Sequence, residues 1–227
     1  MSRFPIQMKW HDLLFAHWPI GVSDLRPLIP EPLEIDTYDG QAWIAIVPFH
    51  MTGVKHPLFP KAMSFPELNV RTYVKHHDKR GVWFFSLDAE SWLTVRGARF
   101  TFGLPYFDAV MAVAHCEDAI GYSSTRYHRG APHAKLEIGY RPTSEPFRAL
   151  AGSLEEFLTE RYCLFSQRRG RVLRGDIQHD PWPLQLAVAE IEHNSMLDAI
   201  GLQLPNIEPL LHFAKFLDVR AANPVPI

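Results

Sequence analysis

The 227-residue sequence is poor in cysteine, in excess positive charge and in long apolar runs. Two cysteines, Cys116 and Cys163, are too few for a disulfide framework or for a zinc site built on thiolates. The 23 basic and 25 acidic residues give a formal net charge of -2, which argues against nucleic acid as a partner. Apolar runs such as residues 82–87 and 109–114 are too short to cross a bilayer.

The opening segment, MSRFPIQMKWHD, contains no apolar signal core. We therefore expect a cytoplasmic protein without a membrane partner. Apolar residues make up 47% of the chain, and a chain of this length buries roughly 70% of its unfolded surface without disulfides or metals. The 19 prolines are spread along the sequence and mark no linker, so we predict a single domain over residues 1–227.

Alternating polar and apolar residues predict a mostly β structure. The clearest alternation is at residues 67–74, where Leu68, Val70, Thr72 and Val74 share one face of the expected strand. Short segments of this kind are separated by Pro and Gly, which is typical of β architectures. The other predicted strands are residues 42–49, 82–87, 110–115, 120–128, 133–141, 171–178, 186–193 and 210–219.

Few helices are predicted. The strongest candidate is residues 154–164, because Ser153 followed by Glu156 has the pattern of a capping box. Shorter helices are expected at residues 24–29 and 195–200. The second of these would end at Gly201.

Several common catalytic and cofactor motifs are absent. No GxSxG, P-loop or GxGxxG motif occurs, so the sequence indicates no cofactor and gives no support to a serine hydrolase. Twelve histidines are present, but none has the spacing of metal ligands; His76 and His77, for example, would point to opposite faces of a strand. We therefore predict no metal site.

The polar face of the strand at residues 67–74 carries the most informative chemistry. Glu67, Asn69, Arg71 and Tyr73 follow one another on that face. Arg71 can bind a carboxylate, Asn69 and Tyr73 can orient it, and Glu67 can transfer protons. The same alternation is expected if the face simply meets water, and the sequence does not decide between water and the interior of a barrel.

Two other polar groups are candidates for the same site. Residues 99–108 bring Arg99 close to Tyr106, with Gly103 and Pro105 predicting a turn before the next strand. Tyr122 and Arg126 share one face of the strand at residues 120–128. A solvated strand surface would explain both groups equally well.

Many segments in order resemble the uncharacterised YqjF-like family of bacterial proteins. They are LLFAHWPI (13–20), LRPLIPEPLEIDTYDGQAWIAIVPF (25–49), FPELNVRTYV (65–74), GVWFFSLDAES (81–91), ARFTFGLPY (98–106), SLEEFLTERYCLF (153–165) and HDPWPL (179–184). The resemblance covers nearly the whole chain and names no reaction.

This family in turn looks like a branch of the acetoacetate decarboxylase-like superfamily. The segment LRPLIPEPLEID is similar to one near the start of the decarboxylases, and Arg99 and Pro105 match the arginine and proline that precede their paired lysines. The resemblance implies an α+β, mostly β fold: a β-cone or barrel of bent antiparallel sheets with a few flanking helices. It also allows a homo-oligomer without fixing a symmetry.

The sequence departs from the superfamily where the lysines would stand, because Tyr106 and Phe107 follow Pro105. A Schiff base of the kind that acetoacetate decarboxylases form requires an amine nucleophile, which neither residue provides. Imine-type decarboxylation is therefore not expected.

Three functions remain open. The first is the binding of a small molecule, a carboxylate, through Arg71, Arg99 and Arg126, with Asn69, Tyr73 and Tyr122 contributing hydrogen bonds. The second is lysine-independent acid–base catalysis by a lyase, isomerase or hydrolase. Glu67 would be the base, Tyr106 or Tyr73 the acid, and Arg71 or Arg99 would stabilise an oxyanion. The third is a structural or partner-binding module whose aromatic residues fill the core completely.

Overall fold

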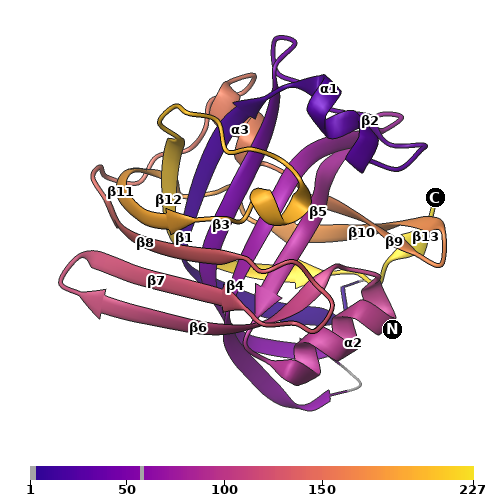
Figure 1. The fold of residues 1–227 in the computed structure, drawn as a ribbon, viewed down its shortest axis with the longest axis horizontal. Helices are drawn as coiled ribbons and strands as arrows, with labels where there is room; N and C mark the ends of the chain where they lie inside the picture. The colour runs from indigo at the N-terminus through magenta and orange to yellow at the C-terminus, as the bar shows by residue number, and fades with distance from the viewer. Residues whose placement is uncertain (1–3, 57–58) are drawn as a thin grey trace.

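Strands dominate the computed structural model, which describes residues 4–56 and 59–227 (Figure 1). Within these residues, thirteen strands belong to one hydrogen-bonded sheet. The strands are β1 Ile6–Ile20, β2 Glu34–Ile35, β3 Ala42–His56, β4 Phe59–His76, β5 Lys79–Ala89, β6 Tyr106–Cys116, β7 Ala119–Arg126, β8 Lys135–Pro142, β9 Cys163–Arg168, β10 Arg171–His179, β11 Gln185–Asn194, β12 Leu210–Ala221 and β13 Val225–Pro226.

The strand pairings close the sheet on itself. Its order is β13-β10-β9-β5-β6-β7-β8-β11-β12-β1-β3-β4-β2, and β4 also pairs with β5 while β10 pairs with β12. Neighbours are antiparallel except that β5 runs parallel to β6 and to β9. Figure 1 shows the long strands β1, β3 and β4 through the middle of the molecule and the β6–β7 hairpin extending to one side. The predicted mostly β fold is confirmed.

The helices are short and lie between strands. They are α1 Val22–Leu25, the 3-10 turn η1 Arg26–Leu28, α2 Trp92–Phe102, α3 Leu154–Thr159 and the 3-10 turn η2 Asp198–Ile200. None of the described helices has the length and apolarity needed to span a membrane. The sequence-based helix at 24–29 corresponds to α1 and η1, and the one at 195–200 is reduced to η2, which ends at the left-handed Gly201.

Helix α3 begins as predicted but ends five residues early. The Ser153 Oγ accepts a hydrogen bond from the Glu156 backbone N–H at 3.2 Å, which confirms the cap. The predicted end at residue 164 is wrong because Arg161 turns back on the helix and its Nε donates to the Phe157 carbonyl oxygen at 2.6 Å. That contact satisfies a carbonyl oxygen at the helix end, and the chain then continues into β9.

Helix α2 and strand β1 were not predicted from the sequence. The turn after α2 was predicted, and the structure confirms it: Gly103 adopts φ +64° and β6 begins at Tyr106. A Cβ on Gly103 would lie 2.7 Å from the Gln167 carbonyl oxygen, so glycine is required there for both its conformation and its size. This close approach fixes α2 against β9.

Both faces of β4 are buried over residues 65–74. Leu68 and Val70 pack in one large hydrophobic cluster together with residues of β6, β7 and β8. The opposite face of β4 carries Glu67, Asn69 and Arg71, each less than a tenth exposed. The alternation at residues 67–74 therefore separates a face that packs in the hydrophobic core from a polar face that also lies in the interior. Bulk water does not cover this polar face.

Candidate functional site

A cavity of about 180 Å³ lies against the polar face of β4. For comparison, an engineered apolar cavity of roughly 150 Å³ accepts benzene. Most of the lining side chains are apolar, and they include Trp10, Phe49, Phe65, Phe84, Leu87, Phe102 and Trp182. The aromatic residues thus leave space in the interior, contrary to the expectation of a completely filled core.

Three of the predicted site residues enter this cavity from one strand. Glu67, Asn69 and Arg71 are spaced two apart on β4 and all line it. The next residue in the alternation, Tyr73, is fully buried but is not part of the lining. Its hydroxyl donates to the Leu158 carbonyl oxygen at 2.8 Å and accepts from His17 Nε2 at 2.7 Å. These two hydrogen bonds fix the Tyr73 ring next to the Arg71 guanidinium.

Glu67 is 3% exposed and forms a hydrogen-bonded pair with Tyr106, the first residue of β6. The Tyr106 hydroxyl donates to Glu67 Oε2 at 2.6 Å. Burial raises the pKa of Glu67 to about 7, and hydrogen bonds from Tyr106 and Asn69 oppose that rise only partly. Burial and the neighbouring Glu67 raise the pKa of Tyr106 well above its ordinary value. Glu67 can therefore gain or lose a proton near neutral pH, whereas Tyr106 keeps its phenol proton.

Arg71 is a buried cation without a carboxylate partner among the described residues. It is 8% exposed, and its guanidinium makes a long contact of 3.5 Å to the Leu158 carbonyl oxygen and a side-chain hydrogen bond to Tyr73. Its Nε–H has no hydrogen-bond partner within the described chain. The guanidinium lies over the rings of Phe15 and Tyr73, at 5.3 and 5.9 Å from their centroids. Aromatic faces stabilise a cation only modestly, so this site is suited to an incoming anion.

A second guanidinium, that of Arg161, lines the cavity behind α3. Its Nη1 donates to Asp36 Oδ2 at 2.6 Å, and Asp36 also accepts from Arg80 Nε at 2.8 Å. Burial opposes ionisation of Asp36, but the two arginines hold its pKa below the ordinary value. One carboxylate is thus shared between two arginines, which adds positive charge to the Arg71 end of the cavity.

Aromatic and charged residues from distant segments complete the wall. The Trp10 and Trp182 rings are stacked at 5.8 Å, and neither indole N–H has a partner among the described residues. His179 lies 5.2 Å from the Trp182 ring, and burial lowers its pKa. Asp176, another lining carboxylate, pairs with Lys79 and Arg174 at 3.8 and 3.3 Å.

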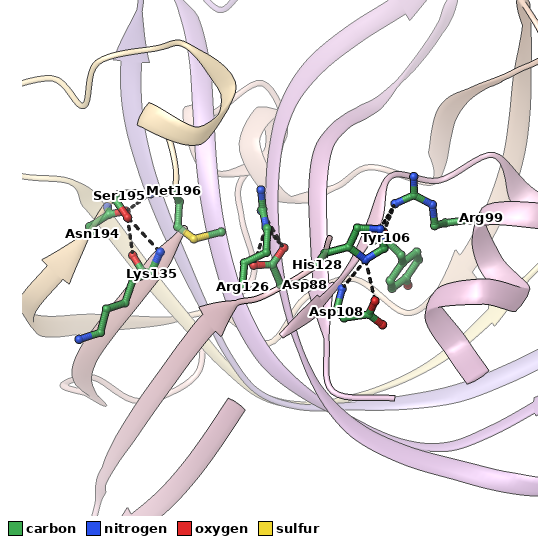
Figure 2. A network of polar contacts seen from close by, with 10 residues as sticks. All are labelled: Asp88, Arg99, Tyr106, Asp108, Arg126, His128, Lys135, Asn194, Ser195 and Met196. Carbon is green, nitrogen blue, oxygen red and sulfur yellow. Dashed lines mark hydrogen bonds and ion pairs between the residues drawn. The ribbon is translucent and has the colours of Figure 1, made fainter. Parts of the chain in front are cut away.

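Besides Tyr73, three predicted ligand-binding residues lie outside the cavity lining: Arg99, Tyr122 and Arg126. Figure 2 shows Arg126 against Asp88 and, apart from them, Arg99 beside His128. Arg126 is 2% exposed and its Nη2 lies 2.7 Å from Asp88 Oδ1, so this guanidinium is already neutralised.

Arg99 and Tyr122 donate hydrogen bonds to backbone carbonyl groups of two site residues. Arg99, on α2, donates to the Tyr106 carbonyl oxygen at 2.6 Å. Tyr122, on β7, donates to the Glu67 carbonyl oxygen at 2.8 Å. These residues do not line the cavity together with Arg71, because strand parity gives the face of a residue but not the space that the face encloses.

The sequence reasoning missed Arg161, Asp36, Trp10, Trp182 and His179. Trp182 and His179 belong to the HDPWPL segment, in which no site residue was predicted. No lysine lines the cavity in the part of the chain that the structure describes. Within residues 4–56 and 59–227, no cluster of three or more His, Cys, Asp or Glu is arranged to hold a metal ion.

Sequence comparison gives the family. Residues 7–218 match the DUF2071 family, described as an uncharacterized conserved protein. The chain belongs to this family. The uncharacterized protein YqjF of Bacillus subtilis (strain 168) is 49% identical over 217 residues, covering 94% of this chain and 89% of YqjF. The resemblance seen in the sequence is thereby confirmed.

Solved structures give this DUF2071 chain an acetoacetate decarboxylase-like fold. The enduracididine biosynthesis enzyme MppR, in complex with the condensation product of pyruvate and imidazole 4-carboxaldehyde, superimposes with a TM-score of 0.68 at 10% identity. An acetoacetate decarboxylase-like enzyme from Sphingomonas wittichii RW1 gives 0.64 at 14% identity, and acetoacetate decarboxylase from Legionella pneumophila gives 0.65 at 14%. These matches cover the whole of this chain and 90%, 94% and 90% of the three others. At such low identity they establish the fold alone.

Proposed function

We propose that this protein binds a small carboxylate-bearing molecule in the cavity, with the Arg71 guanidinium as the anion-binding group. The observation that carries the proposal is the state of Arg71: it is buried in the wall of a mostly apolar cavity and has no carboxylate partner among the described residues. Burying an unpaired charge is costly, and a bound carboxylate would offset that cost with charge-assisted hydrogen bonds.

Arg126 provides the internal comparison. Both arginines are almost fully buried, but Arg126 has its counter-ion, Asp88, within the protein. The described residues around Arg71 supply neutral partners in place of a counter-ion: a carbonyl oxygen, the Tyr73 hydroxyl and two aromatic rings. The missing counter-ion is therefore the reason to expect a ligand.

A thermal-shift screen of small carboxylic acids tests the proposal. We expect at least one acid to raise the melting temperature of the wild-type protein, since a ligand at about 100 times its Kd stabilises a fold by about 2.7 kcal/mol. Arg71→Gln should abolish the shift. Arg141→Gln, which removes an exposed arginine on β8, is the matched control and should leave it unchanged.

Two results would contradict the proposal. In the first, no acid in the screen stabilises the wild-type protein. In the second, an acid stabilises wild type and Arg71→Gln equally, which would place the binding elsewhere.

A second candidate, acid–base catalysis on the bound acid, is favoured by the Glu67–Tyr106 pair. A buried carboxyl with a pKa of about 7 is suited to act as a general base at neutral pH. Glu67 is hydrogen-bonded to a phenol and, within the described chain, forms no ion pair with Arg71 or Arg99. Proton abstraction from a carbon next to a carbonyl or carboxylate group is the chemistry that this arrangement suits best.

Deuterium exchange separates this candidate from simple binding. Acids that stabilise the protein are incubated with it in D₂O, and the loss of C–H signals is followed by NMR. Catalysis predicts exchange that disappears in Glu67→Gln and persists in Arg141→Gln. If the wild-type protein exchanges no faster than buffer, the catalytic candidate is rejected while the binding proposal stands.

A further inference from the structure

The two ends of the cavity differ in chemistry. Glu67 and Arg71 lie four residues apart on one face of β4, which is about 13 Å along an extended strand. Burial has the largest effect on the pKa values of Tyr73 and His17, and the nearby charge of Arg71 acts to lower both. Glu67 instead interacts with Tyr106 and Asn69. One end is therefore cationic, and the other is a hydrogen-bonding group without net positive charge.

The Glu67 end offers hydrogen bonds to an uncharged group. The Tyr106 hydroxyl and the Glu67 carboxyl are 2.6 Å apart, and Asn69 hydrogen-bonds to Glu67. Asn69 is 5% exposed, and its Oδ1 has no partner among the described residues. A buried acceptor left unpaired costs free energy, so a ligand hydroxyl that donates to this oxygen would be favoured. A second carboxylate would be buried at this end without a cation, and it would also be repelled by Glu67 whenever Glu67 is ionised.

The space between the two ends is apolar and of limited size. Aromatic side chains from β1, β3, β4 and β5 surround it: Trp10, Phe49, Phe65 and Phe84. The volume of about 180 Å³ exceeds the roughly 150 Å³ of a cavity that holds benzene, so one ring with short substituents fits. Aromatic walls also favour an aromatic guest through edge and face contacts.

We infer that the cavity selects an aromatic monocarboxylate that carries a hydroxyl group on the ring position opposite the carboxylate. The inference rests on the proposed function, because the carboxylate is placed at Arg71. The ring then fills the apolar middle, and the hydroxyl reaches Asn69, which lies two residues from Arg71 on the same face of β4. Acetate-sized acids leave the aromatic wall uncovered, and an unsubstituted ring leaves the Asn69 oxygen unpaired.

Calorimetric titration with four probes tests the inference: 4-hydroxybenzoate, benzoate, acetate and terephthalate. Benzoate should bind at least tenfold more tightly than acetate, since a buried ring contributes more than one such factor. The hydroxyl should add up to about tenfold, the effect of one net hydrogen bond. Terephthalate, with a carboxylate at each end, should bind more weakly than benzoate.

Two variants locate the contacts. Asn69→Leu should remove the advantage of 4-hydroxybenzoate over benzoate and leave benzoate binding in place, whereas Arg71→Gln should weaken both. Arg141→Gln should behave as wild type. If Asn69→Leu does not fold, the comparison of 4-hydroxybenzoate with benzoate on the wild-type protein still decides the matter.

The outcomes separate the inference from the proposed function. If acetate binds as tightly as 4-hydroxybenzoate, or benzoate binds as tightly as 4-hydroxybenzoate, the inference is overturned and carboxylate binding at Arg71 survives. If terephthalate binds best, the assignment of the Glu67 end is wrong. If none of the probes, nor any acid in the thermal-shift screen, binds, both proposals fail.

Discussion

Replacing Glu67 by glutamine should change how stability depends on pH. In the folded protein burial raises the pKa of Glu67 from an ordinary value of 4.5 to about 7. Between these values the folded state keeps the proton and the unfolded state has lost it. Because the unfolded state then binds fewer protons, the free energy of unfolding of the wild-type protein falls as pH rises. Glutamine does not titrate, so Glu67→Gln escapes this loss.

The magnitude follows from the two pKa values. Each pKa unit corresponds to about 1.4 kcal/mol, so the rise from 4.5 to about 7 costs the folded state roughly 3 kcal/mol at alkaline pH. Below the unfolded value both states are protonated and this cost is absent. Glu67→Gln should therefore gain roughly 3 kcal/mol relative to wild type between about pH 4 and pH 8. The amide oxygen can still accept the hydrogen bond from Tyr106.

Urea unfolding at a series of pH values measures this difference. Comparing the variant with wild type at each pH cancels the titration of every other group that the two proteins share. Glu190→Gln, an exposed position on β11, is the control and should give a flat difference. A flat difference for Glu67→Gln would show that Glu67 is ionised in the folded protein at neutral pH. A difference that falls with pH would mean that a cation holds the Glu67 carboxylate.

Four further outcomes are expected. Arg71→Met should raise the free energy of unfolding by about 1 kcal/mol in urea titrations while abolishing carboxylate-induced thermal shifts, because it removes an unpaired buried charge; a loss of stability would show that the charge is compensated. Asp88→Asn should cost about 3–5 kcal/mol in the same titrations, since it leaves the buried Arg126 unpaired, and a cost below 1 kcal/mol would contradict the pairing. Gly103→Ala should cost about 1–3 kcal/mol by forcing a left-handed residue against the Gln167 carbonyl, and an unchanged urea midpoint would argue against that approach. Borohydride reduction in the presence of a β-keto acid should leave the protein mass unchanged by mass spectrometry, because no described lysine lines the cavity; a reduced adduct would restore imine chemistry.

Local patterns predicted the strand that carries the site. The alternation at residues 67–74 placed Glu67, Asn69 and Arg71 on one face, and all three line the cavity. The turn at Gly103 before Tyr106 was also predicted. These features depend on residues that are close in the chain, whereas the contact between Tyr106 and Glu67 depends on the pairing of β5 with β4 and with β6.

The rest of the site depends on tertiary pairing that no local pattern contains. Arg126 and Arg71 look alike in the sequence, and only the neighbouring Asp88 makes one a paired and the other an unpaired charge. Arg161 reaches the cavity because α3 ends before it, at Thr159, and because it pairs with Asp36, which is distant in the chain. Neither contact could be deduced from spacing.

The most direct test of the account is a calorimetric titration of benzoate into wild type, Arg71→Lys and Arg71→Gln. If the guanidinium binds the carboxylate, the Kd should rise moderately in Arg71→Lys, which keeps the charge but loses the planar pair of donors, and by at least about tenfold in Arg71→Gln. Measurable wild-type binding with the same Kd in all three proteins would contradict the assignment of Arg71 as the anion-binding residue.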